Sequence, residues 1–294
     1  MFINKFYSWV CKRTPLITFD TRLELYDSLP HPVVAHKAIP EWFKKIKPTV
    51  EKQELIEAGT VKRCIPVLDA VTQGFIIPLW ADLQVKVYKA YDFKNAKGQI
   101  VYTTGSLHPE DLLGTKPKDV DHTLVSYKEK KDLGICFTMS EFDLNGDEGI
   151  LMDGHAWNQV GDLCDLKKFK FGQVLQKLIN PWIIKTSKGY SIQIKNPSNN
   201  WSNEITLIEA VVDSDTYYNN INFPFVWTGK EIGEFVIPRG TPIVHIIPFK
   251  RKKYKMKVQL QNHNQLIKTN NMLRTKFYDS YKSLFWHKRN QPKD

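Results

Sequence analysis

The chain has 294 residues, of which 42% are hydrophobic and 25% charged, and its formal net charge is +11. This length suits one large domain or two smaller ones, and the composition is that of an ordinary globular protein. No apolar run approaches the ~20 residues that a membrane-spanning helix requires, which argues against a transmembrane segment.

The net charge is confined to one end of the chain. Residues 250–294 contain 13 lysines and arginines against 2 acidic residues, whereas residues 1–249 contain 29 of each sign. A basic segment on a neutral body indicates an appendage with its own function or its own solvation. We therefore expect a lead-in segment over 1–60, a mainly-β body over 61–250 and a basic helix or tail over 251–294.

The first residues, MFINKFYSWVCKRTPL, place basic residues after an apolar patch, which reverses the order found in a signal peptide. This order predicts an intracellular chain, in the host cytoplasm if the protein is viral. Four widely spaced cysteines (Cys11, Cys64, Cys136, Cys164) include no Cys-x-x-Cys pair. Reduced thiols are therefore expected instead of a zinc ribbon or a disulfide framework.

Prolines enforce extended backbone in the lead-in segment, so residues 41–46 can form only a brief helix before Pro48. The following stretch, to about residue 92, consists of short β-type runs broken by Gly74 and Pro78. Within it, Leu83, Val85 and Val87 alternate and should face one side of a strand. The sequence NAKGQ (95–99) lies between two such runs and predicts a hairpin turn.

Residues 105–135 are polar and carry prolines and glycine, which predicts a long surface excursion. The sequence GICFTMSEF then returns to strand-like content. The next apolar stretch, FKFGQVLQKLINPW, fits either a short helix that ends before Pro181 or an irregular strand.

Residues 182–249 contain four or five short runs rich in Ile, Val, Phe, Tyr and Trp, separated by Gly, Pro, Asn and Asp. This pattern predicts an all-β unit, a sandwich or barrel, which a hairpin at Arg239-Gly240 should close. After it, apolar residues lie at spacings of 7, 4, 4 and 3 and predict a single amphipathic helix over 264–286; they are Leu266, Leu273, Phe277, Tyr281 and Leu284.

Five motifs in this part of the chain resemble the C-terminal half of an uncharacterised family found mainly in phage and bacterial genomes. The resemblance covers about residues 30–256 and implies no activity, because none is assigned to the family. The motifs are Asn-Pro-Trp (180–182), Gly-Tyr-Ser (189–191), Val-Asp-x-Asp (212–215), Asn-Phe-Pro-Phe (222–225) and Gly-Thr-Pro-Ile (240–243).

The order of a Gly-Tyr strand, a Pro-Ser turn, a hydrophobic-Asp turn and a final strand after Gly240 is similar to the deoxyuridine triphosphatase and deoxycytidine deaminase group, whose β-clip fold binds nucleotides. This resemblance implies a β-clip-like part over 182–250, with residues 242–249 as the last core strand. We therefore expect a mainly-β (α+β) fold, with a β-clip-like or jelly-roll body and a basic C-terminal amphipathic helix.

The chain departs from that group where its chemistry lies. The phosphate-binding turn keeps Ser198 but has no arginine, and the base-recognition turn keeps Asp213 but replaces Tyr-Arg-Gly by residues 216–218 (Thr-Tyr-Tyr). His245 stands where a glutamine is usual, and the glycine-rich tail is absent. Because an anionic nucleotide needs N–H donors and cations, these differences argue against triphosphate hydrolysis.

The candidate ligand-binding residues are Ser198, Asp213, Asp215, Tyr217 and His245. Asp213 and Asp215 could form a carboxylate pair for a metal or for acid-base chemistry, or they could bond local backbone N–H groups in a turn. His245 could line a ligand site or be a hydrogen-bonded core histidine.

The acidic stretch SEFDLNGDEGILMDGH superficially suggests an EF-hand, but Glu148 stands where the loop needs glycine and Gly154 where it needs a carboxylate. Asp153 and His155 could begin the carboxylate-histidine set of a non-haem iron site. A solvated acidic loop is the alternative interpretation of these residues.

The tail interleaves cations with aromatic residues, as single-strand nucleic-acid grooves and interfacial helices do. Its candidate contact residues are Lys250, Arg251, Lys252, Lys253, Arg274 and Lys276. The alternatives are a terminal helix that docks its apolar stripe on the body with its lysines in water, and self-association into a homo-oligomer.

Three functions follow from these candidates. The first is a phage-type accessory protein that binds a small anionic or nucleotide-like ligand in a β-clip cleft. The second is a non-enzymatic structural or interaction protein whose basic C-terminal helix acts on nucleic acid, a virion or a host factor. The third is a metal-dependent oxygenase that uses Asp153 and His155. The sequence identifies no cofactor and leaves open whether the chain is an enzyme.

Overall fold

The computed structural model of the chain describes residues 16–52, 56–106, 108–118, 120–139, 152–154, 176–201, 204–229, 231–275 and 279–287. Most of the regular structure is antiparallel β-sheet, which confirms the predicted mainly-β class. The described strands form several open sheets and no closed barrel.

The central sheet has five strands in the order β14-β12-β17-β5-β2, and all neighbours are antiparallel. Strand β17 lies in the middle, where it pairs with β12 on one side and β5 on the other, and Ile243, Val244 and Ile246 on it are buried. The expected final core strand is therefore present. The strands are β2 (Val33–Val34), β5 (Phe75–Pro78), β12 (Tyr190–Lys195), β14 (Ala210–Val212) and β17 (Pro242–Lys250).

A second sheet has the order β13-β15-β10-β9. In β15 the alternating residues Phe223, Phe225 and Trp227 are buried, as the period of a half-buried strand requires. The strands are β9 (Met152–Gly154), β10 (Gln176–Leu178), β13 (Ile205–Leu207) and β15 (Phe223–Trp227). Strand β10 falls in the segment whose sequence fitted either a helix or a strand, and residues 169–175 of that segment lie outside the described part.

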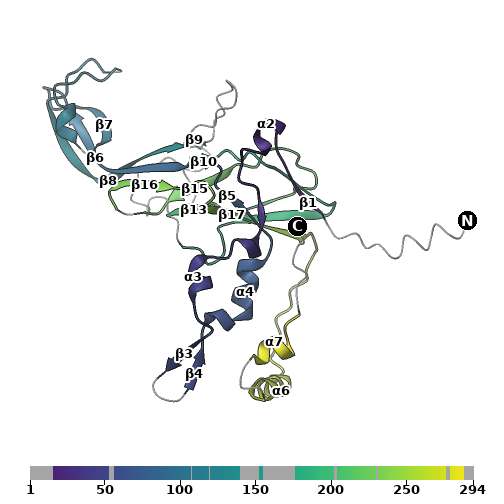
Figure 1. Cartoon of the computed structure of the whole chain (residues 1–294). Helices are drawn as coiled ribbons and strands as arrows, with labels where there is room; N and C mark the ends of the chain where they lie inside the picture. Colours follow the sequence, from purple (N-terminus) through teal and green to yellow (C-terminus); the bar gives the residue numbers. More distant parts are fainter. Residues whose placement is uncertain are drawn as a thin grey trace, which may run out of the picture.

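A third sheet is built on the long strand β6 (Leu83–Lys94), which projects from the body in Figure 1. Strands β16 (Gly233–Ile237) and β7 (Ile100–Ser106) share one edge of β6, and β8 (Ser126–Met139) pairs along the other. Leu83, Val85 and Val87 are completely buried, as their alternation predicted.

The hairpin predicted at residues 95–99 connects β6 to β7. The side-chain oxygen of Asn95 accepts hydrogen bonds from the backbone N–H groups of Lys97 and Gln99, each at 3.0 Å. Gly98 has a positive φ of 75°, which a glycine adopts without steric cost. This prediction is confirmed.

The predicted excursion over 105–135 is too long. The polar loop contains the short helix η3 (Pro109–Leu112), but from Ser126 onward the chain is strand β8. The polar residues of this strand, such as the exposed Lys128, belong to a strand with a solvent-exposed side and not to a loop.

Two helical segments and a hairpin extend from one end of the body (Figure 1). The brief helix expected over 41–46 is α3 (Glu41–Lys45). Helix α4 (Ile65–Thr72), by contrast, lies where the sequence suggested β-type runs; Pro66 stands in its first turn, where proline is tolerated. The other elements here are α2 (Leu23–Tyr26), η1 (Ala35–Lys37), η2 (Val61–Arg63), and the strands β3 (Thr49–Lys52) and β4 (Ile56–Gly59).

The lead-in segment also contributes to the sheets. Strand β1 (Ile17–Asp20) pairs antiparallel with β11 (Ile183–Thr186), and β2 forms one edge of the central sheet. One apolar core joins the sheets, and its largest fully buried side chains include Trp80, Trp182, Phe223 and Phe225. The described residues of 182–249 form strands joined by turns and loops, with no helix among them, which agrees with the predicted all-β region.

The turn at residues 238–241 does not close a hairpin, so that prediction is wrong. The turn itself exists, since the Thr241 N–H bonds the Pro238 carbonyl at 3.1 Å and Gly240 has a φ of 85°. However, β16 before it pairs with β6, whereas β17 after it pairs with β12 and β5. The turn therefore carries the chain from one sheet to another.

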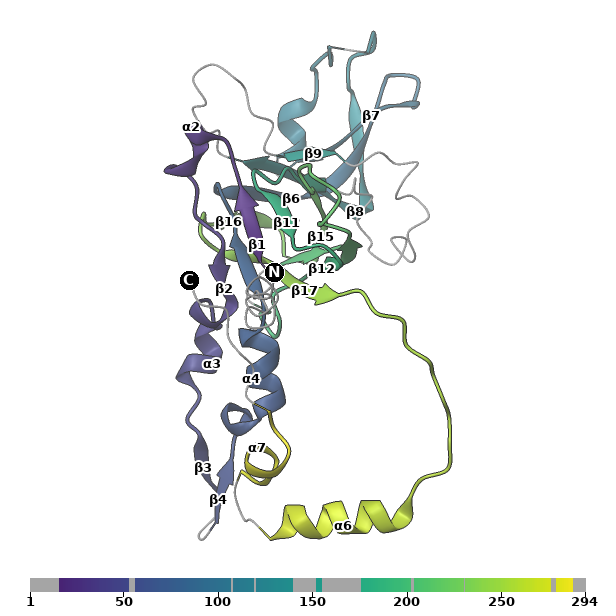
Figure 2. The ribbon, with the colours of Figure 1, turned by 90° about the vertical axis from the view of Figure 1, so that its right-hand side faces the viewer.

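The C-terminal region is also more divided than predicted. After β17, residues 251–262 (hereafter the linker) run in extended form outside the body (Figure 2). Two helices follow, α6 (His263–Arg274) and α7 (Ser280–Leu284), in place of the single helix expected over 264–286. Asp279, directly before α7, has a left-handed backbone with a φ of 57°, so a continuous helix cannot pass through it.

Candidate functional site

His245 and Ser198 lie together at one end of strand β12. The Nε2 atom of His245 bonds the backbone carbonyl of Gln73 at 2.5 Å, and its Nδ1 atom lies 3.4 Å from the Ser198 N–H and 3.3 Å from the Ser198 hydroxyl. Since the carbonyl can only accept and the amide can only donate, His245 is neutral with its proton on Nε2. Burial lowers the pKa of this completely buried side chain, which keeps it neutral.

This arrangement connects three parts of the chain. Gln73 ends helix α4, Ser198 lies in the turn after β12, and His245 is in the middle of the central sheet. Next to this turn, the Trp42 indole N–H donates to the Asn199 carbonyl at 2.8 Å. His245 therefore holds α4 and the 197–200 turn against the sheet, as a hydrogen-bonded core histidine does.

Asp213, Asp215 and Arg251 form a second cluster, at the other end of β12. Arg251 forms a bidentate ion pair with Asp215, with N···O distances of 2.8 and 2.6 Å. One of its guanidinium nitrogens also lies 3.2 Å from a carboxylate oxygen of Asp213. Asp215 also accepts the Gly189 N–H at 2.8 Å, and Asp213 accepts the Ser191 hydroxyl proton at 2.6 Å. The cluster thus holds the turn before β12, the turn after β14 and the start of the linker together.

The hydrogen bonds from Arg251 and from the Gly189 N–H lower the pKa of Asp215 to about 2. In turn, Asp215 raises the pKa of Arg251. Only 2% of the Asp215 side chain is exposed, against 62% for Asp213. Asp215 is therefore an anion whose charge Arg251 already balances. This ion pair fits the interpretation in which the two aspartates stabilise a turn better than the one in which they bind a metal.

Tyr217 lies in the same turn, where its N–H bonds the Asp213 carbonyl at 3.0 Å and its side chain is 46% exposed. The structure thus brings Asp213, Asp215 and Tyr217 together. It separates them from Ser198 and His245. Asp213 accepts a hydrogen bond from Ser191 near the start of β12, whereas His245 pairs with Lys195 at the end of that strand. These two positions on β12 lie about 13 Å apart at a strand rise of ~3.3 Å per residue.

The candidate metal residues are only partly described. Asp153 lies on strand β9, where its backbone pairs with Lys177, and His155 lies outside the described residues. Within the described ranges, no group of three or more His, Cys, Asp and Glu residues is placed to hold a metal ion. Cys64 and Cys136 are exposed free thiols.

The candidate partner-contact residues are spread along the C-terminal region. Lys250, Lys252 and Lys253 are exposed at the end of β17 and in the linker, and Arg274 is exposed at the end of α6. Arg251 is held in the aspartate cluster, and Lys276 lies outside the described residues. The linker thus starts from a fixed point and presents free lysines immediately after it.

The linker also has a pattern that the sequence predictions did not use. Apolar residues Tyr254, Met256, Val258 and Leu260 alternate with Lys253, Lys255, Lys257 and Gln259. In an extended chain this period of two places the apolar side chains on one side and the lysines on the other. The alternation is visible in the sequence and could have identified the segment as a two-sided strand.

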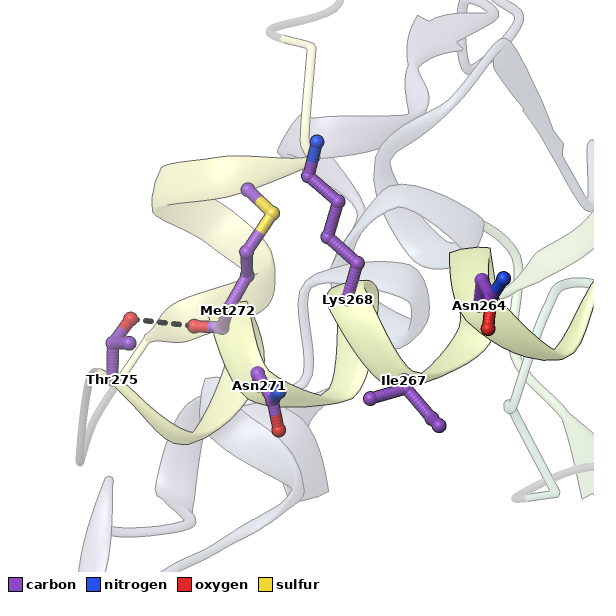
Figure 3. Close-up of a pocket in the computed structure, with 6 residues that line it drawn as sticks. All are labelled: Asn264, Ile267, Lys268, Asn271, Met272 and Thr275. Carbon is purple, nitrogen blue, oxygen red and sulfur yellow. Dashed lines mark hydrogen bonds between the residues drawn. The ribbon is translucent and has the colours of Figure 1, made fainter.

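Helix α6 borders an open hollow of about 420 Å³ (Figure 3). The residues that line it come from one face of the helix and include the apolar Ile267 and Met272 and the polar Asn264, Lys268 and Asn271. Figure 3 shows these side chains projecting from α6 itself, so the hollow is an uncovered helix face and not an enclosed ligand site.

No protein-family model matches the chain, and no curated relative is similar to it in sequence. The two resemblances stated from the sequence therefore stay predictions. Among the described helices, none is both long enough and apolar enough to cross a lipid bilayer.

Proposed function

We propose that the chain is a non-enzymatic interaction protein that binds nucleic acid through the lysines at the start of its C-terminal region. The observation that carries this proposal is that Lys252, Lys253, Lys255 and Lys257 are all exposed on the linker, which runs outside the body (Figure 2). No hydrogen bond or ion pair joins residues 252–261 to the other described residues. These lysines therefore have no acidic partner among them.

The spacing of the lysines supports a polyanionic partner. Lys253, Lys255 and Lys257 are two residues apart, so in an extended segment successive ammonium groups on one side lie about 6.6 Å apart. A row of cations at regular intervals neutralises successive phosphates of a nucleic-acid backbone and releases the bound counterions. The rest of the chain is close to electrically neutral, so it adds little attraction or repulsion of its own.

A nucleotide-like ligand in a β-clip cleft has less support. Of its candidate residues, His245 is completely buried, and Asp215 is matched by Arg251. The remaining exposed carboxylate, Asp213, carries the same sign as a phosphate and would oppose an anionic ligand. Arg251, the one cation in that cluster, already makes a bidentate pair.

The test measures the salt dependence of nucleic-acid binding by fluorescence anisotropy with labelled single-stranded and duplex oligonucleotides. In the test variant, four linker lysines are replaced by glutamine: Lys252→Gln, Lys253→Gln, Lys255→Gln and Lys257→Gln. Each lost phosphate contact should reduce the slope of log K against log salt by about 0.9 on duplex and about 0.7 on single strands. Four contacts therefore correspond to a reduction of about 3 to 4.

A control variant with the same change in charge separates the linker from the overall charge. It replaces four exposed lysines of the β6–β8 lobe, namely Lys97, Lys116, Lys118 and Lys128. We expect this control to keep the slope of the unaltered chain to within about one contact. Equal losses in the two variants, or no measurable binding by the unaltered chain at low salt, would refute the proposal.

A further inference from the structure

The apolar side of the linker is exposed to an extent that a folded chain rarely leaves uncovered. The exposed fractions are 86% for Tyr254, 91% for Met256, 85% for Val258 and 97% for Leu260. Single exposed apolar residues are ordinary, but four on one side of an extended segment form a continuous apolar edge. Such an edge marks an interaction surface, and it is the side opposite the lysines discussed above.

Helix α6, which follows the linker, also has no buried residue. Its residues Leu266, Ile267 and Met272 have exposed fractions of 40%, 45% and 38%. Figure 3 shows Ile267 and Met272 beside the open hollow along this helix. The uncovered surface therefore extends from the linker into α6.

The end of the C-terminal region, by contrast, has a specific docking site. The Trp286 indole N–H donates to the Asp69 carboxylate on α4 at 3.0 Å, and Asp279 pairs with Arg63 on η2 at 3.1 Å. Figures 1 and 2 both show α7 near α4. Every copy of the chain therefore carries both the docking segment, residues 279–287, and its receptor, residues 63–69.

We propose that this C-terminal region is exchanged between two copies of the chain, so that residues 279–287 of each copy dock on α4 and η2 of the other. The linker allows this because no hydrogen bond or ion pair ties residues 252–261 to the rest of the described chain. Its 12 residues span at most about 40 Å when extended. The exchanged contacts are the same as those within one chain, so exchange costs little contact energy.

The exchange explains the apolar edge, which a closed single chain leaves in water. In a two-fold pair the two linkers cross between the bodies, and the edges formed by Tyr254, Met256, Val258 and Leu260 can pack face to face. A hydrogen-bonded ladder between the two linkers is less favourable, because it would set lysines opposite lysines. Face-to-face packing leaves Lys253, Lys255 and Lys257 on the outer sides, where they stay available to a polyanion.

The decisive experiment traps the exchanged contact with a short bismaleimide cross-linker. Two differently tagged full-length chains are co-expressed. One keeps only its native Cys64, which is exposed and adjoins Arg63, and the other carries only Ser280→Cys, adjacent to Asp279. The remaining native cysteines are replaced by serine. We expect a covalent dimer that carries both tags, and a mass of two chains by sedimentation without the cross-linker.

A control pair replaces Ser280→Cys by Lys97→Cys, at the exposed tip of the β6–β7 hairpin. This pair should give no cross-linked product. A chain that sediments as a monomer at all concentrations overturns the proposal. A dimer whose two tags cross-link no better than in the control pair overturns it as well, since association would then use another surface.

A second variant tests the apolar edge and separates this proposal from nucleic-acid binding. The replacements Met256→Ser, Val258→Ser and Leu260→Ser should weaken the dimer by at least about tenfold, because three apolar side chains lose their burial. The four-lysine variant described above should leave the dimer intact. A dimer that is unaffected by the serine replacements contradicts the packed linkers, whether or not nucleic acid binds.

Discussion

His245 offers a sharp test of how the central sheet is held to α4. Its Nε2–H is bonded to the Gln73 carbonyl at 2.5 Å, and the Ser198 N–H points at its Nδ1 atom from 3.4 Å. The substitution His245→Leu removes the imidazole that bonds both the Gln73 carbonyl and the Ser198 N–H. A buried carbonyl that loses its hydrogen bond costs about 1–3 kcal/mol, and the longer contact to Ser198 adds less, so we expect a total loss of about 2–4 kcal/mol in the free energy of unfolding.

The matched substitution is His245→Gln, because a glutamine amide can donate to the Gln73 carbonyl and accept from the Ser198 N–H. We expect it to cost less than about 1.5 kcal/mol. Both values come from urea unfolding followed by tryptophan fluorescence, with Trp80 and Trp182 as buried reporters. Equal stability of the leucine and glutamine variants would show that the two hydrogen bonds contribute nothing.

The same pair of proteins gives a pH dependence with a defined sign. Burial lowers the pKa of His245 in the folded chain from its usual 6.5, so the unfolded chain binds the proton more readily. Stability from this source is constant above pH 6.5 and decreases as the pH falls below it. Between pH 7 and pH 5.5 the unaltered chain should lose more stability than His245→Gln, with an upper limit of about 1 kcal/mol set by protonation of the unfolded chain alone. Parallel pH curves for the two proteins would refute this assignment.

Two further predictions concern the aspartate cluster and the close approach of Gly74 to β17. Because its pKa is about 2, the Asp215 carboxyl should titrate near pH 2 in an NMR experiment and return towards 3.8 in Arg251→Gln; its contribution to stability is complete above pH 3.8 and is lost as the pH falls towards 2. An unshifted midpoint in Arg251→Gln would contradict the bidentate pair. Gly74→Ala should disrupt the fold, because the added Cβ would clash with the backbone oxygen of Ile246 and the φ of Gly74 is +77°. The control is Gly98→Ala, which has a similar φ of +75° but open space around it. We expect Gly98→Ala to cost only about 1–2 kcal/mol in thermal unfolding. Similar losses in the two variants would show that the close approach to β17 is unimportant.

Much of the local structure could be predicted from the sequence. The alternation of Leu83, Val85 and Val87 identified the buried side of β6, and the NAKGQ sequence identified the turn that follows it. These predictions succeeded because hydrophobic period and turn chemistry depend on residues only a few positions apart.

The predictions that failed or stayed open depend on distant contacts. The segments on both sides of Gly240 have the pattern of a hairpin, yet β16 pairs with β6 and β17 with β12 and β5. Residues 65–72 contain β-branched residues, yet they form helix α4. In this helix the Asp69 carboxylate accepts a hydrogen bond from Trp286, which lies 217 residues away in the sequence. Local preference is weak enough for tertiary packing to override it.

The candidate site shows the same division. Residue types alone identified Ser198, Asp213, Asp215, Tyr217 and His245, but only the folded chain distributes them between the two ends of β12. His245 meets Gln73 across 172 residues, and Arg251 meets Asp215 across 36. The sequence by itself determined which side chains carry charge and which segments favour strands. Only the tertiary structure decided which of those charges are matched and which remain free, because matching depends on the three-dimensional meeting of residues that are far apart along the chain.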